Sequence, residues 1–208
     1  MYVPSRFASA DTTFAAKIIA ENAFGLLISR GQDAPFATHM PFVYRKDEGE
    51  HGTLYGHVAR ANPQWQSFDG KTQALATFLG PHGYVSPLWY ETKEAVPTWN
   101  YVAVHATGAP RLLDEPETRV MLDRLTASFE DGAAPWSMAS QSADFIRAKI
   151  KGIAAFALPI AKLESKAKLG QDRKRADSLG VARALRQRGN TTLADLMERA
   201  AQPEKVNA

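Results

Sequence analysis

The most distinctive stretch of the chain, residues 80–108, reads GPHGYVSPLWYETKEAVPTWNYVAVHATG. It holds two of the four tryptophans, and polar side chains stand between its aromatic ones. Proline and glycine set unusual backbone geometry, while tyrosine and tryptophan combine a flat apolar face with a polar group. A strand that served only a hydrophobic core would use Val, Ile and Leu instead. The stretch therefore predicts a rigid surface for a planar, hydrogen-bonding ligand.

The end of this stretch alternates as a two-faced strand does. One face carries Asn100, Val102 and Val104, and the other carries Trp99, Tyr101, Ala103 and His105. Working outward, we expect strands at residues 26–29, 36–44, 53–60, 74–79, 84–90, 99–113 and 153–163. Short strands at regular spacing, with few helices between the early ones, favour an antiparallel barrel, which also leaves no exposed sheet edge.

Helices are expected at residues 11–24, 114–130, 142–151, 179–188 and 192–201. Asp11 and Asp114 are candidate N-caps, and Glu117 completes a capping box with Asp114. Gly25 and Gly152 are expected to end the first and third helices. The expected buried stripes contain Phe14 and Ile18, then Leu122, Leu125 and Phe129, then Phe145, Ile146 and Ile150, and finally Leu193, Leu196 and Met197.

The composition of the 208 residues is that of an ordinary globular domain, with 45% hydrophobic and 23% charged residues. Because the chain has no cysteine, disulfides, thiolate metal sites and thiol catalysis are excluded. The first residues contain no long apolar run, so we expect no signal peptide, no membrane helix and a cytoplasmic location. The net charge of +3 is mild, but Lys and Arg are concentrated between residues 162 and 188, where they favour phosphate groups.

Common catalytic and nucleotide-binding motifs are missing from the sequence. It contains neither GxGxxG nor GxxxxGK[ST], and neither HExxH nor GxSxG. The five histidines show no short metal-binding spacing, so no metal site is expected. Rossmann, P-loop, zinc-protease and serine-hydrolase functions are therefore disfavoured.

Three further clusters carry groups suited to a ligand. They are THMPF at residues 38–42, GHVARANPQW at 56–65 and KAKLGQDR at 166–173. Proline restricts its predecessor to extended backbone, and an arginine at a strand end can form a forked contact with a phosphate. Each cluster also fits a plainer interpretation, respectively a strand edge, a surface ion pair and a solvated basic turn.

Six motifs in order across residues 1–173 resemble those of one family: MYVPSRF, THMPF, GHVARANPQW, FLGPHGYVSPLWY, VPTWNYVAVHATG and KLESKAKLGQDR. The set is similar to that of the PaiB-like FMN-binding proteins, often named negative transcriptional regulators, which are relatives of the pyridoxamine-phosphate-oxidase-like flavoproteins. The resemblance implies a six-stranded antiparallel split β-barrel, a homodimer and FMN at the dimer interface. It implies a split-barrel domain over residues 1–175, with a helical hairpin and tail over 176–208 packed on it.

The resemblance also implies residues that bind the cofactor. FMN needs cations for its phosphate, hydrogen bonds along the flavin edge and flat contacts for its ring. The cations are Arg60, Lys168 and Arg173; the polar groups are Thr38, His39, Ser86, Asn100 and Gln171; the ring contacts are Tyr84, Trp89, Trp99 and Tyr101; and Met40, Pro41 and Asn62 complete the set.

Three functions remain open at this stage. The first is an FMN-binding regulator that acts through its flavin, because helix 192–201 carries Asp195 and Glu198 beside a single cation and suits base reading poorly. The second is an FMN-dependent oxidoreductase reduced by a nicotinamide donor, with His82 or Tyr101 as a proton donor. The third is a haem-binding split-barrel protein that uses one of the histidines. No catalytic residue or substrate is assigned.

Overall fold

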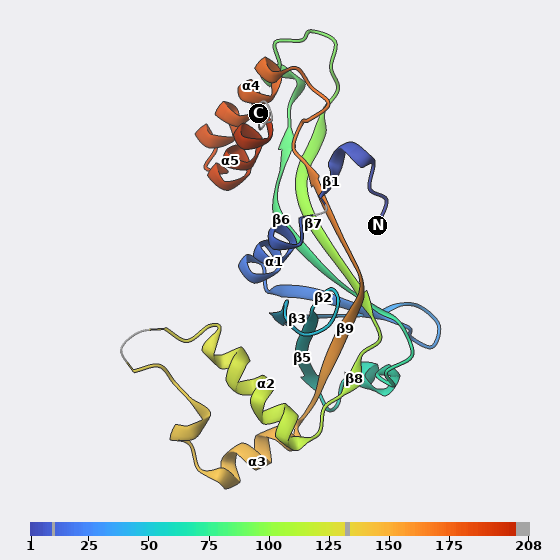
Figure 1. Ribbon diagram of the computed structural model, residues 1–208. Coiled ribbons are helices and arrows are strands. Elements are labelled where there is room, and N and C mark those ends of the chain that lie inside the picture. The colour runs from blue at the N-terminus through green and yellow to red at the C-terminus, as the bar shows by residue number, and fades with distance from the viewer. Residues whose placement is uncertain (10, 132–133, 203–208) are drawn as a thin grey trace. The chain divides into compact units, whose positions relative to one another are not determined.

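The computed structural model describes residues 1–9, 11–131 and 134–202, which are mainly β with helices (Figure 1). The strands are β1 (Ala8–Ser9), β2 (Phe24–Ser29), β3 (Phe36–Pro41), β4 (Val43–Arg45), β5 (Thr53–Ala59), β6 (Ala74–Val85), β7 (Thr98–Gly108), β8 (Arg111–Leu112) and β9 (Ile153–Lys168). The α-helices are α1 (Thr12–Glu21), α2 (Glu115–Ala127), α3 (Ala143–Lys151), α4 (Arg175–Gln187) and α5 (Thr191–Ala200). Short 3-10 helices include η2 (Pro63–Ser67) and η3 (Pro87–Trp89).

Hydrogen bonds connect the strands in the order β3-β2-β6-β7-β9-β5-β4. The pairing is antiparallel from Phe24↔Pro41 to Ser29↔Phe36 between β2 and β3, and from Thr53↔Pro159 to Ala59↔Ile153 between β5 and β9. Six strands have six or more residues, while β1, β4 and β8 have two or three. The expected class, antiparallel β with peripheral helices, is confirmed, and the short strands account for the larger strand number.

The chain forms two compact units, each assembled from separate segments. The terminal unit comprises Met1–Ile18, Leu79–Val104 and the chain from Glu164 onward. The central unit comprises Ile19–Phe78 and His105–Leu163. Strands β6, β7 and β9 contribute residues to both units. The helical hairpin α4–α5 belongs to the terminal unit.

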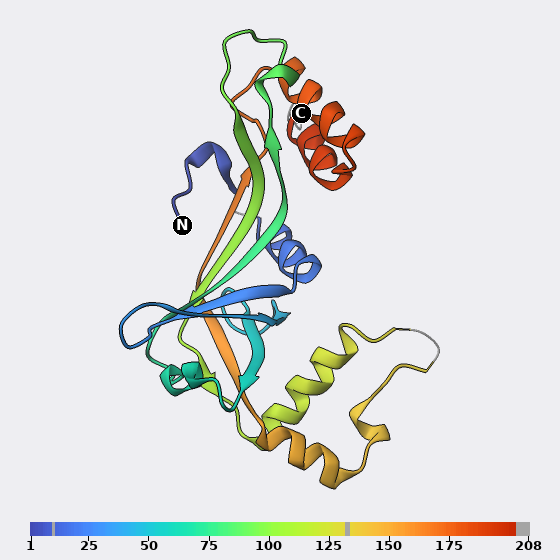
Figure 2. The same cartoon turned by 180° about the vertical axis from the view of Figure 1, so that it is seen from behind.

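Aromatic rings fill the core of the central unit. The Phe42 ring meets Phe78 at 5.3 Å and Phe156 at 6.4 Å between centroids, both edge to face. Strand β5 turns Leu54 and Val58 into this core and leaves its other face half-buried, as the alternation predicts. Helices α2 and α3 lie side by side in the same unit (Figures 1 and 2).

The core of the terminal unit lies between β7 and the α4–α5 hairpin. Asn100 and Val102 are buried on one face of β7, again as predicted. Leu185 of α4 and Leu193 and Met197 of α5 are also buried, which confirms the expected stripe of α5 except that Leu196 is only half-buried.

Strand β6 corrects the expectation of separate strands at 74–79 and 84–90. The chain continues as one strand through Gly80, where a Cβ would lie 3.3 Å from side-chain carbons of Ile18 and Val102. Glycine here serves close packing and does not break the strand. The strand ends at Val85, and Ser86 then accepts a hydrogen bond from the Leu88 backbone and caps η3.

Other element boundaries also differ from the expected ones. The expected strand 36–44 divides at Phe42, whose backbone N–H donates to the Ala23 carbonyl at 2.9 Å. The expected strand 99–113 divides into β7 and β8, and β9 runs past residue 163 to Lys168. Helix α1 ends at Glu21, before Gly25, which lies within β2, and α4 begins at Arg175.

The predicted N-caps Asp11 and Asp114 are confirmed. Asp11 accepts bonds from the backbone of residues 13 and 14, and Asp114 and Glu117 form the reciprocal capping box. The predicted stripes are wrong at Phe129 and Phe145, whose side chains are 59% and 47% exposed. Among the described residues, every helix is too short or too polar to cross a bilayer.

Candidate functional site

The cofactor-binding residues predicted from sequence fall into two groups, one in each unit. The central unit holds Thr38, His39, Met40, Pro41, Arg60 and Asn62. The terminal unit holds Tyr84, Ser86, Trp99, Asn100, Tyr101, Lys168, Gln171 and Arg173.

Asn62 connects β3 to the turn that follows β5. Its side-chain N–H donates to the Thr38 hydroxyl at 2.9 Å, and its amide oxygen accepts the Gln64 backbone N–H at 2.9 Å. The second bond caps η2, which begins at Pro63. Two predicted residues that are far apart in sequence are therefore brought into direct contact.

Arg60 lies at the end of β5 with its backbone fixed on both sides. Its N–H donates to the Gly152 carbonyl at 2.8 Å, and its own carbonyl accepts the Trp65 indole N–H at 2.9 Å. The guanidinium lies 5.0 Å from the Trp65 ring centre. None of the described carboxylates forms an ion pair with Arg60, so its charge is exposed and free to meet an anion. We call Thr38, Arg60, Asn62 and Trp65 the Arg60 corner.

The THMPF segment lies on β3 and just beyond it. His39 is exposed, and its ring stacks on Phe24 at 6.2 Å with an interplanar angle of 16°. Met40 is buried and packs over Gly56, where a Cβ would come within 2.3 Å of the methionine methyl group. His39 thus faces outward and Met40 inward, so that a ligand on this strand meets the imidazole.

Three side-chain polar atoms of the central unit are buried with no hydrogen-bond partner among the described residues: Arg45 Nε, which lies 3.5 Å from a Glu48 carboxylate oxygen, His57 Nδ1 and Gln64 Oε1. The Gln64 side-chain amide N–H groups donate to the Leu27 carbonyl and the Ser29 hydroxyl. Burial lowers the pKa of His57, which favours the neutral imidazole. Sequence reasoning named His57 only as one of four possible haem ligands and did not single out Gln64, although both lie within the GHVARANPQW motif.

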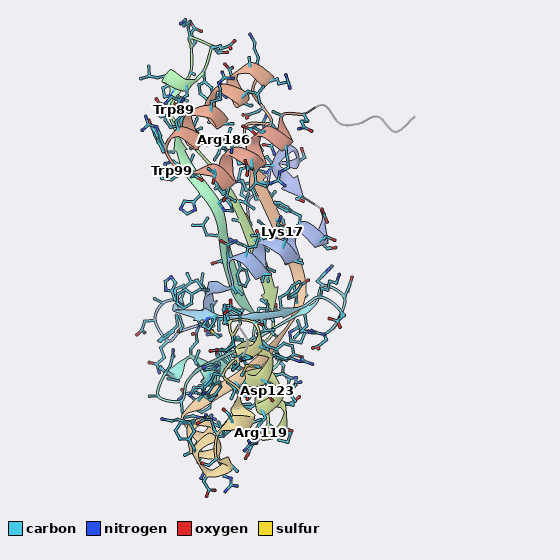
Figure 3. All side chains as sticks on the ribbon, turned by 90° about the vertical axis from the view of Figure 1, so that its left-hand side faces the viewer. Lys17, Trp89, Trp99, Arg119, Asp123 and Arg186 are labelled. Carbon is cyan, nitrogen blue, oxygen red and sulfur yellow. The ribbon has the colours of Figure 1, made fainter. Side chains whose placement is uncertain are left out.

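In the terminal unit the aromatic residues of the opening stretch gather on one exposed surface. The Trp99 ring lies 6.4 Å from His82, nearly parallel to it, and 6.2 Å from Tyr84, edge to face. Trp99, which is labelled in Figure 3, is 54% exposed, and Tyr84 is 45% exposed. The predicted aromatic surface is therefore present.

The predicted cations of this unit already contact the protein. Lys168 donates to the Thr98 hydroxyl, and the Arg173 guanidinium lies 5.0 Å from the Tyr90 ring. Tyr101 faces Lys166, whose ammonium is 5.2 Å from the ring centre.

Asn100 and Gln171 have their polar groups engaged within the terminal unit. The Asn100 side chain is buried and donates to the Met197 sulfur at 3.4 Å, so it faces α5. Gln171 bonds the Leu169 N–H and the Ala167 carbonyl, which closes its own turn. Asn100 thus joins β7 to α5, and Gln171 fixes the backbone of its own turn.

Comparison with known proteins relates the chain to one family. The model of the family described as "Putative FMN-binding domain" matches residues 1–162. The chain is 33% identical over 204 residues to the Protease synthase and sporulation protein PAI 2 of Bacillus subtilis, covering 95% of this chain and 97% of the relative.

Solved structures share the fold at low sequence identity. The FAD and heme binding protein from Mycobacterium smegmatis has a TM-score of 0.60 and 16% identity, over 78% of this chain and 74% of that one. The flavocytochrome Anf3 from Azotobacter vinelandii has a TM-score of 0.58 and 17% identity, over 79% and 70%. The resemblance inferred from the six motifs and the split-barrel class are confirmed.

Proposed function

Because the chain belongs to this FMN-binding family, FMN is its cofactor, and we propose that the Arg60 corner holds the FMN phosphate. The observation that carries the proposal is the Arg60 guanidinium. It stands at a strand end without an ionic partner among the described residues, on a backbone held by two hydrogen bonds. A phosphate accepts forked hydrogen bonds from such a group.

The neighbouring residues also fit the cofactor. The Thr38–Asn62 pair places a hydroxyl and an amide beside the same strand end. The Nδ1 atom of His57 on β5 is buried and has no hydrogen-bond partner among the described residues. A polar atom of a bound ligand would supply that partner. When bound, FMN supplies electron-transfer chemistry, and the protein contributes placement and electrostatics. Arg60 neutralises the phosphate, Asn62 orients Thr38, and His57 stays neutral.

We further propose that the protein is a homodimeric regulator that acts through its bound flavin. Against direct reading of DNA, Arg186 of α4 is paired with Asp195 at 2.7 Å and Glu198 at 2.9 Å on α5 (Figure 3). Asp195 and Glu198 lie on α5, the helix that would have to contact the bases, and they offset the positive charge of Arg186. Exposed apolar side chains of the central unit, among them Phe24 and Phe129, support a dimer contact.

The test is reconstitution with FMN. We expect one FMN per chain, a flavin absorbance spectrum and a molar mass in solution of twice the 22.8 kDa chain. We also expect no retardation of duplex DNA at micromolar protein in 150 mM salt. A monomer that binds FMN would overturn the dimer alone, and DNA retardation that weakens as salt rises would overturn the flavin-only regulator. A protein that binds no FMN in titration would overturn the assignment of the Arg60 corner.

A further inference from the structure

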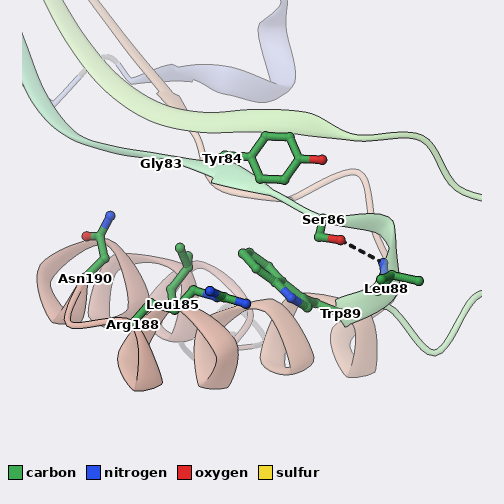
Figure 4. A pocket seen from close by; sticks show the side chains of 8 residues that line it. All are labelled: Gly83, Tyr84, Ser86, Leu88, Trp89, Leu185, Arg188 and Asn190. Atoms are coloured by element: carbon green, nitrogen blue, oxygen red, sulfur yellow. Dashed lines mark hydrogen bonds between the residues drawn. The ribbon is translucent and has the colours of Figure 1, made fainter.

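The terminal unit contains a groove between β6, η3 and α4 (Figure 4). Its volume is about 480 Å³, within the range of small-molecule sites. The lining residues are Gly83, Tyr84, Ser86, Leu88, Trp89, Leu185, Arg188 and Asn190. We call this the Arg188 groove.

The Trp89 ring forms the aromatic wall of the groove, and Tyr84 packs against that ring from β6. The Tyr84 and Trp89 rings meet edge to face, 6.4 Å apart between centroids. Trp89 projects over α4, and the Arg188 guanidinium lies 5.1 Å from its ring (Figure 4). The ring surface and the planar guanidinium together favour a flat ligand.

The polar groups that remain unused in the groove can donate hydrogen bonds. The Trp89 indole N–H is not hydrogen-bonded within the described part of the chain, and Arg188 has no ion pair there. The Ser86 hydroxyl accepts from the Leu88 N–H at 3.2 Å and keeps its own proton to donate. None of the lining residues is acidic. The ligand's polar part must therefore accept hydrogen bonds, and the arginine favours a negative charge.

The framework of the groove is fixed by contacts that leave these donors free. Asn190 donates to the His82 carbonyl at 2.9 Å and accepts from the Leu193 N–H. On α4, a Cβ at Gly180 would lie 2.5 Å from the Trp89 carbonyl, so glycine lets η3 pack directly on the helix. A preformed groove loses little entropy when a ligand binds.

We infer that the Arg188 groove binds a second ligand besides FMN, a planar aromatic molecule that carries one carboxylate or phosphate. The aromatic part lies against Trp89, and the anion lies against Arg188. Ser86 and Trp89, which the family resemblance implies as flavin contacts, then serve this second ligand. Aromatic carboxylates and mononucleotides share this chemistry, and the experiment separates them.

The experiment is calorimetric titration of the FMN-saturated protein with two pairs of probes. The pairs are adenosine 5′-monophosphate with adenosine, and indole-3-acetate with indole-3-acetamide. We expect the charged member of at least one pair to bind about tenfold or more tighter than its neutral partner, without releasing FMN. The pair that shows this difference identifies the source of the anion. Failure of both charged probes to bind at millimolar concentration would overturn the inference, as would displacement of FMN by either.

Variants locate the binding in the groove. Arg188→Gln is expected to weaken the charged probe about tenfold and leave FMN affinity unchanged, because Arg188 lies outside the Arg60 corner. Arg175→Gln removes the same charge from the first turn of α4, away from the groove, and is expected to leave the probe's affinity within twofold. Trp89→Leu is expected to cost about tenfold through lost stacking. Equal effects of Arg175→Gln and Arg188→Gln would contradict a built site and indicate attraction to a basic helix alone.

Discussion

Each unit contains one arginine–tryptophan pair. The two pairs have nearly the same distance between guanidinium and ring, but they differ in whether the indole N–H is hydrogen-bonded. Arg60 lies 5.0 Å from the Trp65 ring and Arg188 lies 5.1 Å from the Trp89 ring. The Trp65 indole N–H donates a hydrogen bond to the Arg60 carbonyl, whereas the Trp89 indole N–H has no partner among the described residues.

The difference shows that a cation–π contact alone does not define a role. At Arg60 the tryptophan fixes the arginine's main chain, so the pair presents one well-positioned cation, suited to a phosphate. At Arg188 the ring edge and the cation are both available, and they line a groove together. This difference supports the proposed roles, a phosphate contact for the first pair and a surface for an aromatic anion for the second.

The largest expected effect is at the first pair. Arg60→Gln removes the only charge of the Arg60 corner, so we expect about 100-fold weaker FMN binding by fluorescence titration. Arg60→Lys keeps the charge, loses the fork and is expected to cost about tenfold. The matched control is Arg119→Gln on α2, an exposed arginine paired with Glu115, which is expected to leave FMN affinity unchanged. Unchanged binding by Arg60→Gln would place the phosphate elsewhere.

The second largest effect is expected at Asp177 of α4, which anchors the segment that follows Trp89. Its carboxylate accepts the Thr92 hydroxyl at 2.6 Å and the Glu91 and Thr92 N–H groups, which attaches the segment after η3 to α4. We expect Asp177→Asn to lower the free energy of unfolding by about 2 kcal/mol, measured in urea at pH 7. Thr92→Val, which removes one of the three bonds, is expected to cost less. A change below 0.5 kcal/mol (roughly the scatter for surface sites) would contradict this anchoring.

The same carboxylate predicts a pH dependence. The Thr92 hydroxyl and then the backbone N–H groups lower the pKa of Asp177. Its stabilisation is therefore complete above the ordinary carboxyl pKa of about 4 and is lost as the pH falls below that value. Urea unfolding between pH 7 and pH 3 is expected to show a shallower fall for Asp177→Asn than for the wild type. Identical slopes would contradict the lowered pKa.

Asn62 gives a smaller effect at the first pair. Asn62→Ala removes the cap of η2 and the bond to Thr38, so we expect a loss of about 1 kcal/mol in stability and about tenfold in FMN affinity. Thr38→Val breaks only the bond between the two side chains. If Thr38→Val leaves FMN binding intact while Asn62→Ala weakens it, the amide itself contacts the cofactor. Equal FMN affinity of all three proteins would remove this pair from the site.

The smallest effect is expected at Arg186, which has acidic partners and no tryptophan. Its two ion pairs are exposed and screened by solvent, so Arg186→Gln is expected to leave the free energy of unfolding nearly unchanged. The variant is expected to bind FMN and the groove probes as the wild type does. Weakened probe binding would mean that the charge of α4 as a whole, and not Arg188, attracts the anion.

Much of the fold follows from sequence because alternation and capping are local. The two faces of β5 and β7 and the caps at Asp11 and Asp114 are predicted from neighbouring residues alone. The continuation of β6 through Gly80 is not, because the glycine's reason lies in Ile18 and Val102, far along the chain. The exposure of Phe129 likewise depends on what covers it.

The site follows from sequence less completely. The six motifs identify the family and point to Arg60, Asn62 and Thr38. They do not predict that Trp89 and Arg188 meet, because 99 positions separate them and each residue alone is ordinary. Nor do they predict that the Asn100 side chain faces the Met197 sulfur, since its partner comes from the C-terminal helix.

Titration of Arg60→Gln and Arg188→Gln with FMN, side by side with the wild type, tests the central claim most directly. The phosphate assignment predicts about 100-fold weaker FMN binding for Arg60→Gln and wild-type affinity for Arg188→Gln. Circular dichroism of both variants controls for folding. The opposite result, in which Arg188→Gln loses FMN and Arg60→Gln keeps it, would contradict the division of roles between the two arginine–tryptophan pairs.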